Sequence, residues 1–164
     1  MQEINWFAVA FIVLPHTGGL AGGIITKKNI FWYNGLKKPF GTPPSWSFSP
    51  IWTILYSSMG YASYMVYRDG HGFDGPAGLP LIIYGINLLA NWTWTPMFFA
   101  RKNMKLALYN MQLINATALC MAYLFYKINT TAGLLIIPYL TWLVISTYLN
   151  YSFMIKNPPK TATN

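Results

Sequence analysis

The chain has 164 residues, of which 54% are hydrophobic and only 9% are charged, with a formal net charge of +8. A soluble domain carries about a quarter charged residues, so this composition excludes an ordinary soluble protein. The basic residues stand in short segments beside long apolar runs, which favours anionic lipid headgroups over nucleic acid as their partner.

Charged side chains are absent from five long runs, at residues 4–26, 39–67, 75–100, 106–126 and 128–155. Each run is at least as long as the roughly 20 residues that cross a bilayer core. Because an unpaired charge in hydrocarbon is costly, a membrane chain confines its charges to the loops. We therefore predict an all-α integral membrane protein, a bundle of five transmembrane helices in one domain over residues 1–156. The predicted spans are about 4–25, 46–67, 79–99, 106–126 and 130–154, and residues 157–164 form a short disordered tail.

The distribution of charge also predicts the orientation of the chain. With five spans, the segments 27–38 and 101–105 and the C-terminal tail share one side, which holds nine of the eleven basic residues and no acid. Such an excess in short loops is typical of a cytosolic face. We expect a cytosolic C-terminus and an N-terminus on the other side of the membrane.

The first span contains two pairs of small residues four positions apart, Gly18 with Gly22 and Gly19 with Gly23. Small residues at this spacing let another backbone approach closely. The approaching element is a helix of the same bundle or a second copy of the chain, and a cavity wall is a third interpretation. His16 lies near the middle of the same span, where an ionisable side chain is a candidate functional group and polar packing is the simpler explanation.

The longest connection runs from Asn29 to Ser45 and is rich in aromatic residues and proline. Prolines stiffen a chain, and buried aromatic rings hold it down. A long ordered loop in a small protein often covers a binding site. We expect this segment to act as a lid, with an interfacial aromatic anchor as the alternative.

The later spans carry polar and aromatic side chains at depth. Uncharged amides inside a bilayer must hydrogen-bond across helices or to a ligand; they are Asn87, Asn91, Asn110, Gln112, Asn115 and Asn150. Trp52, Trp94 and Trp142 stand where the spans approach the basic side or the middle of the bundle. These patterns predict an aromatic-lined cavity between helices, capped by the 29–45 segment.

Four sequence blocks make this interpretation specific. They read WYNGLKKP followed by PPSW, then PIWTILY, then NWTWTPMFF, and finally PYLTW followed by LNY, within residues 32–151. In this order and spacing they resemble the tryptophan-rich sensory protein family, also called the translocator protein or peripheral-type benzodiazepine receptor family. One block alone would be a weak signal, whereas four in register make a chance match very rare.

The resemblance implies a five-helix bundle, often dimeric, with a pocket on the cytosolic side under the first loop. It also implies a membrane receptor or carrier for cholesterol and other sterols, for porphyrins or haem, and for synthetic benzodiazepine-type or isoquinoline ligands. Carried over by motif, the pocket residues are Gly23, Thr26, Phe48, Ser49, Trp52, Trp94, Leu106, Leu113, Trp142, Ser146 and Leu149.

The chain departs from the family pattern at several of these places. Gly41 and Leu106 stand where animal members commonly have aromatic residues, and Ser146 stands where a small Ala is usual. The sterol motif of animal members ends in Arg, whereas Leu149, Tyr151 and Lys156 fit only the looser L-x-Y-x₄-K form. An interfacial Tyr–Lys pair explains that pattern equally well.

Three classes of function stay open at this stage. The first is a receptor or carrier, and the second is a porphyrin-degrading or tetrapyrrole-sensing protein that uses the pocket tryptophans. The third is a structural membrane protein. The sequence offers no metal-ligand set, no nucleophile–base pair and no carboxylate within a span, so we predict no enzyme activity, no cofactor and no catalytic residue, and we rank binding and transport first.

The predicted location is the mitochondrial outer membrane. The block at 60–64 resembles animal members, and no presequence is recognisable at the start of the chain. A bacterial envelope and a membrane of the secretory pathway are the alternatives. Asn129 begins an N-T-T sequon on the predicted non-cytosolic face, and we expect it to be unmodified.

Overall fold

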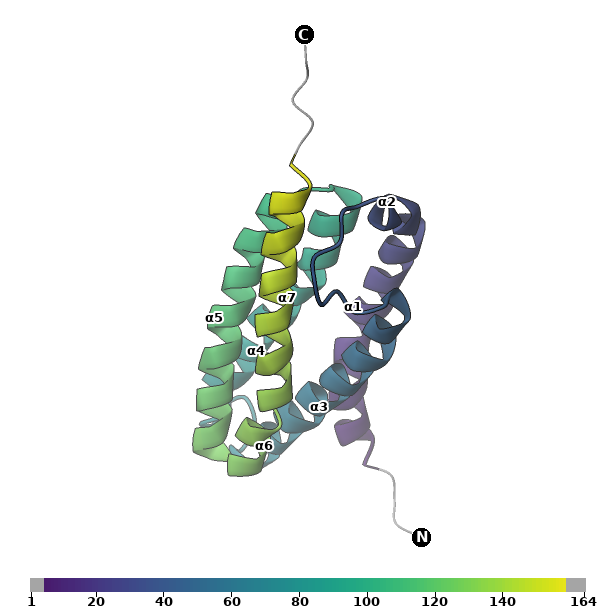
Figure 1. Cartoon of the computed structure of the whole chain (residues 1–164). Coiled ribbons are helices and arrows are strands. Elements are labelled where there is room, and N and C mark those ends of the chain that lie inside the picture. Colours follow the sequence, from purple (N-terminus) through teal and green to yellow (C-terminus); the bar gives the residue numbers. More distant parts are fainter. Residues whose placement is uncertain (1–4, 159–164) are drawn as a thin grey trace.

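The computed structural model describes residues 5–158, and over these residues the chain forms helices and turns but no β-strand. Five long helices lie side by side in the bundle of Figure 1. They are α1 (Trp6–Lys28), α3 (Phe48–Asp69), α4 (Gly78–Thr95), α5 (Met104–Ile128) and α7 (Ile137–Lys156). The predicted all-α class with five long helices is thereby confirmed.

Short elements connect or extend the long helices. The first connection contains α2 (Ile30–Asn34) and the 3-10 turn η1 (Ser45–Ser47). A π-helical turn, η2 (Pro96–Ala100), continues α4, and α6 (Thr130–Leu134) precedes α7.

Two prolines explain where the helices differ from simple continuous spans. Where we predicted one span over 130–154, the structure has α6 and α7, because Pro138 has no N–H to donate and favours the first turn of a new helix. At Pro96 the α-helix continues as a wider π-helical turn instead of ending. The N–H of Arg101 donates to the Pro96 carbonyl, five residues back, at 2.9 Å.

Asparagine side chains set three of the helix starts. Asn5 accepts from the N–H of Ala8 at the start of α1, and Asn103 accepts from the N–H of Leu106 at the start of α5. Asn129 does the same for α6, with a distance of 2.8 Å to the N–H that it caps. Each cap satisfies a backbone donor that the first helical turn leaves without a partner.

The outer surface of the bundle is largely apolar. On α1 the side chains of Trp6 and Leu20 are 72% and 73% exposed, and Val144 of α7 is 71% exposed. By length and apolar composition alone, α1 and the segment Thr130–Lys156 are each able to cross a bilayer. Lipid tails would cover this outer surface without cost.

The interior contains two buried clusters. The larger joins α3, α4, α5 and α7 around side chains that include Met59, Ile114, Phe125 and Tyr139. The smaller lies at the end of the bundle where α7 finishes, and it joins α2, η2, α5 and α7 through Tyr33, Phe98, Phe99, Met104, Ala107, Leu149 and Phe153.

The glycines of α1 pack mainly against other helices of the bundle. A Cβ atom at Gly18 would overlap the ring of Trp92 in α4, and one at Gly19 would lie 2.8 Å from the ring of Tyr56 in α3. Gly22 likewise faces α4 at short range. Close packing within the bundle therefore explains these three glycines, and they are not free to form a dimer face.

Buried amides and tyrosines form one hydrogen-bonded network across the helices. The hydroxyl of Tyr56 donates to Asn91 Oδ1 at 2.9 Å, and Asn91 Nδ2 donates to the hydroxyl of Tyr139 at 2.9 Å. That hydroxyl in turn donates to Asn87 Oδ1 at 3.0 Å. The network ties α3, α4 and α7 together, which confirms that these amides bond across helices.

The charged residues divide between the two ends of the bundle, and we call the end where α1 and α7 finish the basic end. It carries Lys27, Lys28, Lys37, Lys38, Arg101, Lys102, Lys105 and Lys156. The opposite end carries Arg68, Asp69, Asp74 and Lys127.

Candidate functional site

Three of the predicted pocket aromatics meet between α3 and α7. Phe48 and Trp52 come from the first turns of α3, and Trp142 comes from α7. The ring of Trp142 lies edge-on to Phe48 with centroids 6.1 Å apart, and Trp52 lies 6.4 Å from the ring of Tyr139 and 5.1 Å from that of Tyr56. We call Phe48, Trp52 and Trp142 the aromatic site.

Trp142 contributes a polar group, its indole N–H, to the aromatic site. Its side chain is only 9% exposed, and its indole nitrogen is buried without a hydrogen-bond partner among the described residues. Leaving a buried donor unpaired costs about 1–3 kcal/mol. A ligand that presents a carbonyl or carboxylate oxygen here would remove that cost.

Trp94 has a different environment, although it carries the same side chain. Its indole N–H donates to Asn150 Oδ1 at 2.9 Å, and its ring stacks on Phe98 at 4.9 Å. Asn150 in turn donates to the carbonyl of Met104 at 2.9 Å. Trp94 therefore joins α4 to α7 and α5, and only its half-buried ring remains for contact with a ligand.

The smaller predicted residues differ in their burial. Gly23 of α1 is exposed and has open space where a Cβ atom would lie, which fits a cavity wall. Thr26 and Ser146 are half-buried, and Ser49 is exposed on the first turn of α3. Leu149 is buried within the smaller cluster.

The two predicted leucines of α5 are not in the interior. Leu113 is 49% exposed, and Leu106 is half-buried. The inward face of α5 consists instead of Met104, Ala107, Met111, Ile114, Ala118, Met121 and Phe125. The structure therefore does not bring Leu113 together with the aromatic site, because it lies about 100° around the helix from its buried neighbour Ile114.

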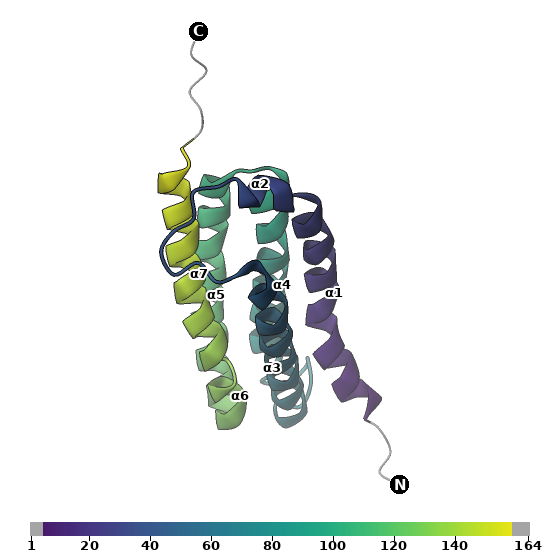
Figure 2. The same ribbon diagram turned by 45° about the vertical axis from the view of Figure 1, so that its right-hand side comes forward.

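Residues 35–47 run from α2 down along α7 before entering α3, as Figures 1 and 2 show. The N–H of Lys37 donates to Asn157 Oδ1 at 2.8 Å, and Asn157 Nδ2 donates back to the carbonyl of Lys37 at 3.1 Å. Further along, the hydroxyl of Tyr148 donates to the carbonyl of Phe40 at 3.4 Å. These contacts dock the segment on α7, as a lid requires.

The aromatic residues of the first connection divide between two roles. Tyr33 is buried and lies 5.6 Å from the rings of both Phe99 and Phe153, and this burial raises the pKa of its hydroxyl. By contrast, Phe31 and Phe40 are 92% and 89% exposed. The inward rings hold the connection down and the outward rings suit a membrane interface, so the lid and anchor interpretations apply to different residues.

Gly41 has a conformational reason to replace an aromatic residue. Its φ angle is +74°, in the left-handed region that favours glycine, and no other atom lies near the position of a Cβ. The turn around it is closed by Thr42, whose hydroxyl donates to the carbonyl of Pro39 at 2.7 Å. Backbone geometry therefore explains this departure from the family pattern.

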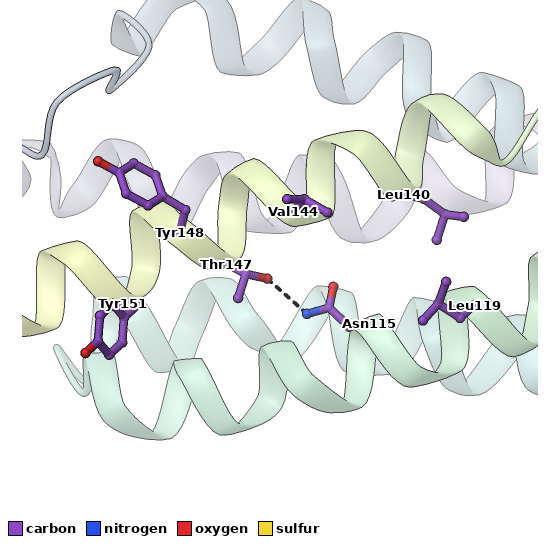
Figure 3. Close-up of a pocket in the computed structure, with 7 residues that line it drawn as sticks. All are labelled: Asn115, Leu119, Leu140, Val144, Thr147, Tyr148 and Tyr151. Atoms are coloured by element: carbon purple, nitrogen blue, oxygen red, sulfur yellow. Dashed lines mark hydrogen bonds between the residues drawn. The ribbon is translucent and has the colours of Figure 1, made fainter.

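The sterol motif is spread over three environments. Leu149 is buried in the smaller cluster, whereas Tyr151 lines an outward groove of about 490 Å³ between α5 and α7. The other residues of this groove, drawn in Figure 3, are Asn115, Leu119, Leu140, Val144, Thr147 and Tyr148. Lys156 lies at the basic end, beside a separate cavity. The structure does not gather the three motif residues into one site.

Sequence reasoning missed the groove between α5 and α7. The groove residues of α7 recur at helical spacing from position 140 to 151, a pattern shared by any lipid-facing stripe. His16 Nε2 lies 3.1 Å from Ser57 Oγ, which agrees with the polar packing that we gave as the simpler explanation for this residue. Among residues 5–158, no three His, Cys, Asp or Glu side chains come together as metal ligands would.

The sequon residue Asn129 is engaged at the opposite end of the bundle. Its Oδ1 accepts from the N–H of Ala132, and its Nδ2 donates to Asp69 Oδ2 at 2.5 Å. Arg68 donates to the same carboxylate, and these bonds, that of Arg68 foremost, hold the pKa of Asp69 below its usual value. The amide nitrogen that would carry a glycan is thus already bonded.

Several known proteins are similar to this chain in sequence. A model described as the TspO/MBR family matches residues 11–155. Translocator protein from Sus scrofa is 41% identical over 145 residues, which cover 88% of this chain and 86% of that protein. Translocator protein from Homo sapiens is 38% identical over the same shares of both chains. Tryptophan-rich protein TspO from Archaeoglobus fulgidus is 31% identical over 91% of this chain and 95% of that protein.

Proposed function

Because the chain belongs to the TspO/MBR family of multi-pass membrane proteins, we propose that it is a membrane receptor or carrier for flat, hydrophobic ligands. The ligand classes are porphyrins or haem, sterols such as cholesterol, and benzodiazepine-type or isoquinoline compounds. The ligand would bind at the aromatic site under the lid and reach it from the basic end.

The observation that carries the proposal is the buried, unpartnered indole N–H of Trp142. A flat ring system can pack against Phe48 and Trp52 while an oxygen on its rim accepts this hydrogen bond. Gly23 adds open space on the α1 side. A site with apolar walls and one oriented donor suits ligands that share a flat hydrophobic body with one polar edge.

A second candidate function is the breakdown or sensing of porphyrins. It is favoured by the run of oxidisable rings from Trp52 to Tyr56 and Tyr139, with centroids 5.1 Å and 6.4 Å from that of Trp52. Such rings can pass an electron to a light-excited porphyrin. That step oxidises the ring and reduces the porphyrin, so breakdown would then need dioxygen to take up the electron and oxidise the porphyrin. A carrier would release its ligand unchanged, whereas breakdown would release an oxidised product.

Direct binding in a bilayer tests the proposal. The full chain in lipid nanodiscs is titrated with protoporphyrin IX and with cholesterol, and thermal unfolding is followed with and without each ligand. Saturable binding and a higher melting temperature support a receptor or carrier. No change with any ligand class would support a structural role. Loss of porphyrin absorbance under light, with a new product in mass spectrometry, would support breakdown instead.

We propose the mitochondrial outer membrane as the location, with the basic end and the C-terminus facing the cytosol and a homodimer as the assembly. The excess of basic residues at that end supports the orientation. A bacterial envelope or a secretory-pathway membrane is the alternative. The engaged amide of Asn129 supports an unmodified sequon.

A further inference from the structure

We propose that a cavity at the basic end binds the phosphate group of an anionic phospholipid. The cavity has a volume of about 450 Å³ and is lined by Trp32, Leu36, Lys37, Lys102, Lys156 and Asn157, among others. Its lysines are distinct from the aromatic site, and it would hold a lipid of the surrounding membrane rather than the transported ligand. We call it the three-lysine cavity.

The three lysines come from separate parts of the chain. Lys37 follows α2, Lys102 lies in the turn between η2 and α5, and Lys156 is the last residue of α7. Only the fold brings them to one cavity, so the cluster is not a simple run of charge in the sequence.

The local backbone orients two of these lysines. Lys102 has a φ of +53°, a conformation that non-glycine residues seldom adopt, and its ammonium lies 5.7 Å from the centre of the Trp32 ring. Lys37 is held by its paired hydrogen bonds with Asn157, which also donates to the carbonyl of Phe153 at 3.0 Å. The cavity is therefore built from ordered backbone and not from free side chains alone.

Among residues 5–158, no acidic side chain lies at the basic end to compensate these charges. The sequence contains no Asp or Glu between residues 4 and 68 or after 74, and Asp69 and Asp74 lie at the opposite end of the bundle. The positive end of the α5 dipole and the negative end of the α7 dipole both lie nearby and largely cancel. Three ammonium groups around one cavity repel each other, and a phosphate would turn that repulsion into charge-assisted hydrogen bonds.

The surroundings indicate a lipid source for the phosphate. Phe31 of α2 lies at the basic end and is 92% exposed, and Ile155 next to Lys156 is 59% exposed. Exposed aromatic and aliphatic side chains beside lysines are typical of headgroup depth in a bilayer. A phospholipid in that layer can place its phosphate in the cavity while its acyl chains cover the apolar outer surface.

The test compares two triple variants of the full chain in nanodiscs. One variant combines Lys37→Gln, Lys102→Gln and Lys156→Gln; the control combines Lys27→Gln, Lys28→Gln and Lys105→Gln, with the same charge change at the same end. Each protein is placed in phosphatidylcholine alone and in phosphatidylcholine with phosphatidylserine. Melting temperature and the lipids retained in native mass spectrometry are measured.

We expect phosphatidylserine to raise the melting temperature of the wild type and of the control, and the cavity variant to lose most of this gain. Its retention of phosphatidylserine should be roughly tenfold weaker. Equal losses in both variants would overturn the proposal in favour of general surface charge. If inorganic phosphate in the neutral bilayer reproduces the gain, the lipid source is wrong. If the triple variant does not fold, the same measurements are made on the single variant Lys156→Gln, with Lys27→Gln as its control.

Discussion

Trp94 donates its indole N–H to Asn150 at 2.9 Å, so the polar edge of this tryptophan is committed to holding α4 against α7. The indole N–H of Trp142 has no such partner among the described residues. The sequence does not distinguish these two tryptophans, but in the structure only one of the two indole N–H groups is hydrogen-bonded. The first tryptophan stabilises the bundle, and we propose that the second binds a ligand.

The first prediction separates these roles by replacing each tryptophan with phenylalanine. Trp142→Phe keeps a ring but loses the free donor, so affinity for protoporphyrin IX should fall by about 1 kcal/mol, or roughly fivefold, with little change in melting temperature. Trp94→Phe leaves Asn150 without its donor and should lower stability by about 1–3 kcal/mol. Titration and thermal unfolding in the same nanodiscs measure both effects, with Trp6→Phe on the exposed start of α1 as the control. Equal loss of affinity in all three variants would mean that the aromatic site is misplaced.

The second prediction concerns the buried amide network. Tyr139→Phe removes the hydroxyl that Asn87 and Asn91 share, leaving two buried amide groups without their partner. We expect a loss of stability of about 1–3 kcal/mol. Tyr123→Phe, at an exposed position of α5, should change little. The melting temperatures of the two variants are compared in the same detergent. Similar values would show that the hydrogen-bonded network does not stabilise the bundle.

The third prediction addresses the crossing of α1 and α3. A Cβ atom at Gly60 would lie 2.5 Å from the carbonyl oxygen of Phe11, a contact with backbone that cannot move aside cheaply. Gly60→Ala should therefore destabilise the bundle by about 1–3 kcal/mol. A Cβ atom at Gly85 of α4 would have no other atom within 4 Å, so Gly85→Ala should be neutral or stabilising by up to about 1 kcal/mol. A Gly60→Ala protein as stable as Gly85→Ala would disprove the tight crossing.

The sequence predicted the helices better than it predicted the sites. Charge-free runs are a property of consecutive residues, and they locate all five long helices. The division of the last segment into α6 and α7 depends on Pro138, whose effect on a helix varies with its neighbours. The three-lysine cavity and the exposed position of Leu113 depend instead on which faces of distant elements meet. Local sequence patterns do not specify contacts between elements that are distant in the chain.

The fourth prediction is that Asn129 carries no glycan in native material. Its Nδ2 atom donates to Asp69, and its Oδ1 atom caps α6, so modification would disturb both contacts. Intact-mass analysis of protein from its own cells should give the unmodified mass at this residue. A glycan there would place the protein in the secretory pathway and contradict the proposed mitochondrial location.

The last prediction concerns the lid. Pro43 and Pro44 lead into η1, where the N–H of Ser47 donates to the carbonyl of Pro44 at 2.9 Å. Replacing both prolines with glycine frees the backbone of the open state, at about 0.4–1 kcal/mol for each residue, so a bound ligand should leave roughly 4- to 30-fold faster. The association rate should change less, because opening is needed mainly for release.

Stopped-flow displacement of a bound porphyrin measures the two rates, and circular dichroism checks that the helices persist. Pro76→Gly, in the connection at the opposite end of the bundle, is the control and should leave both rates unchanged. An unaltered dissociation rate in the Pro43→Gly, Pro44→Gly protein would show that residues 35–47 only anchor the chain at the membrane surface. The ligand would then leave sideways between helices. The boundary between α3 and α7, where Phe48 contacts Trp142 and Trp52 contacts Tyr139, would become the expected exit.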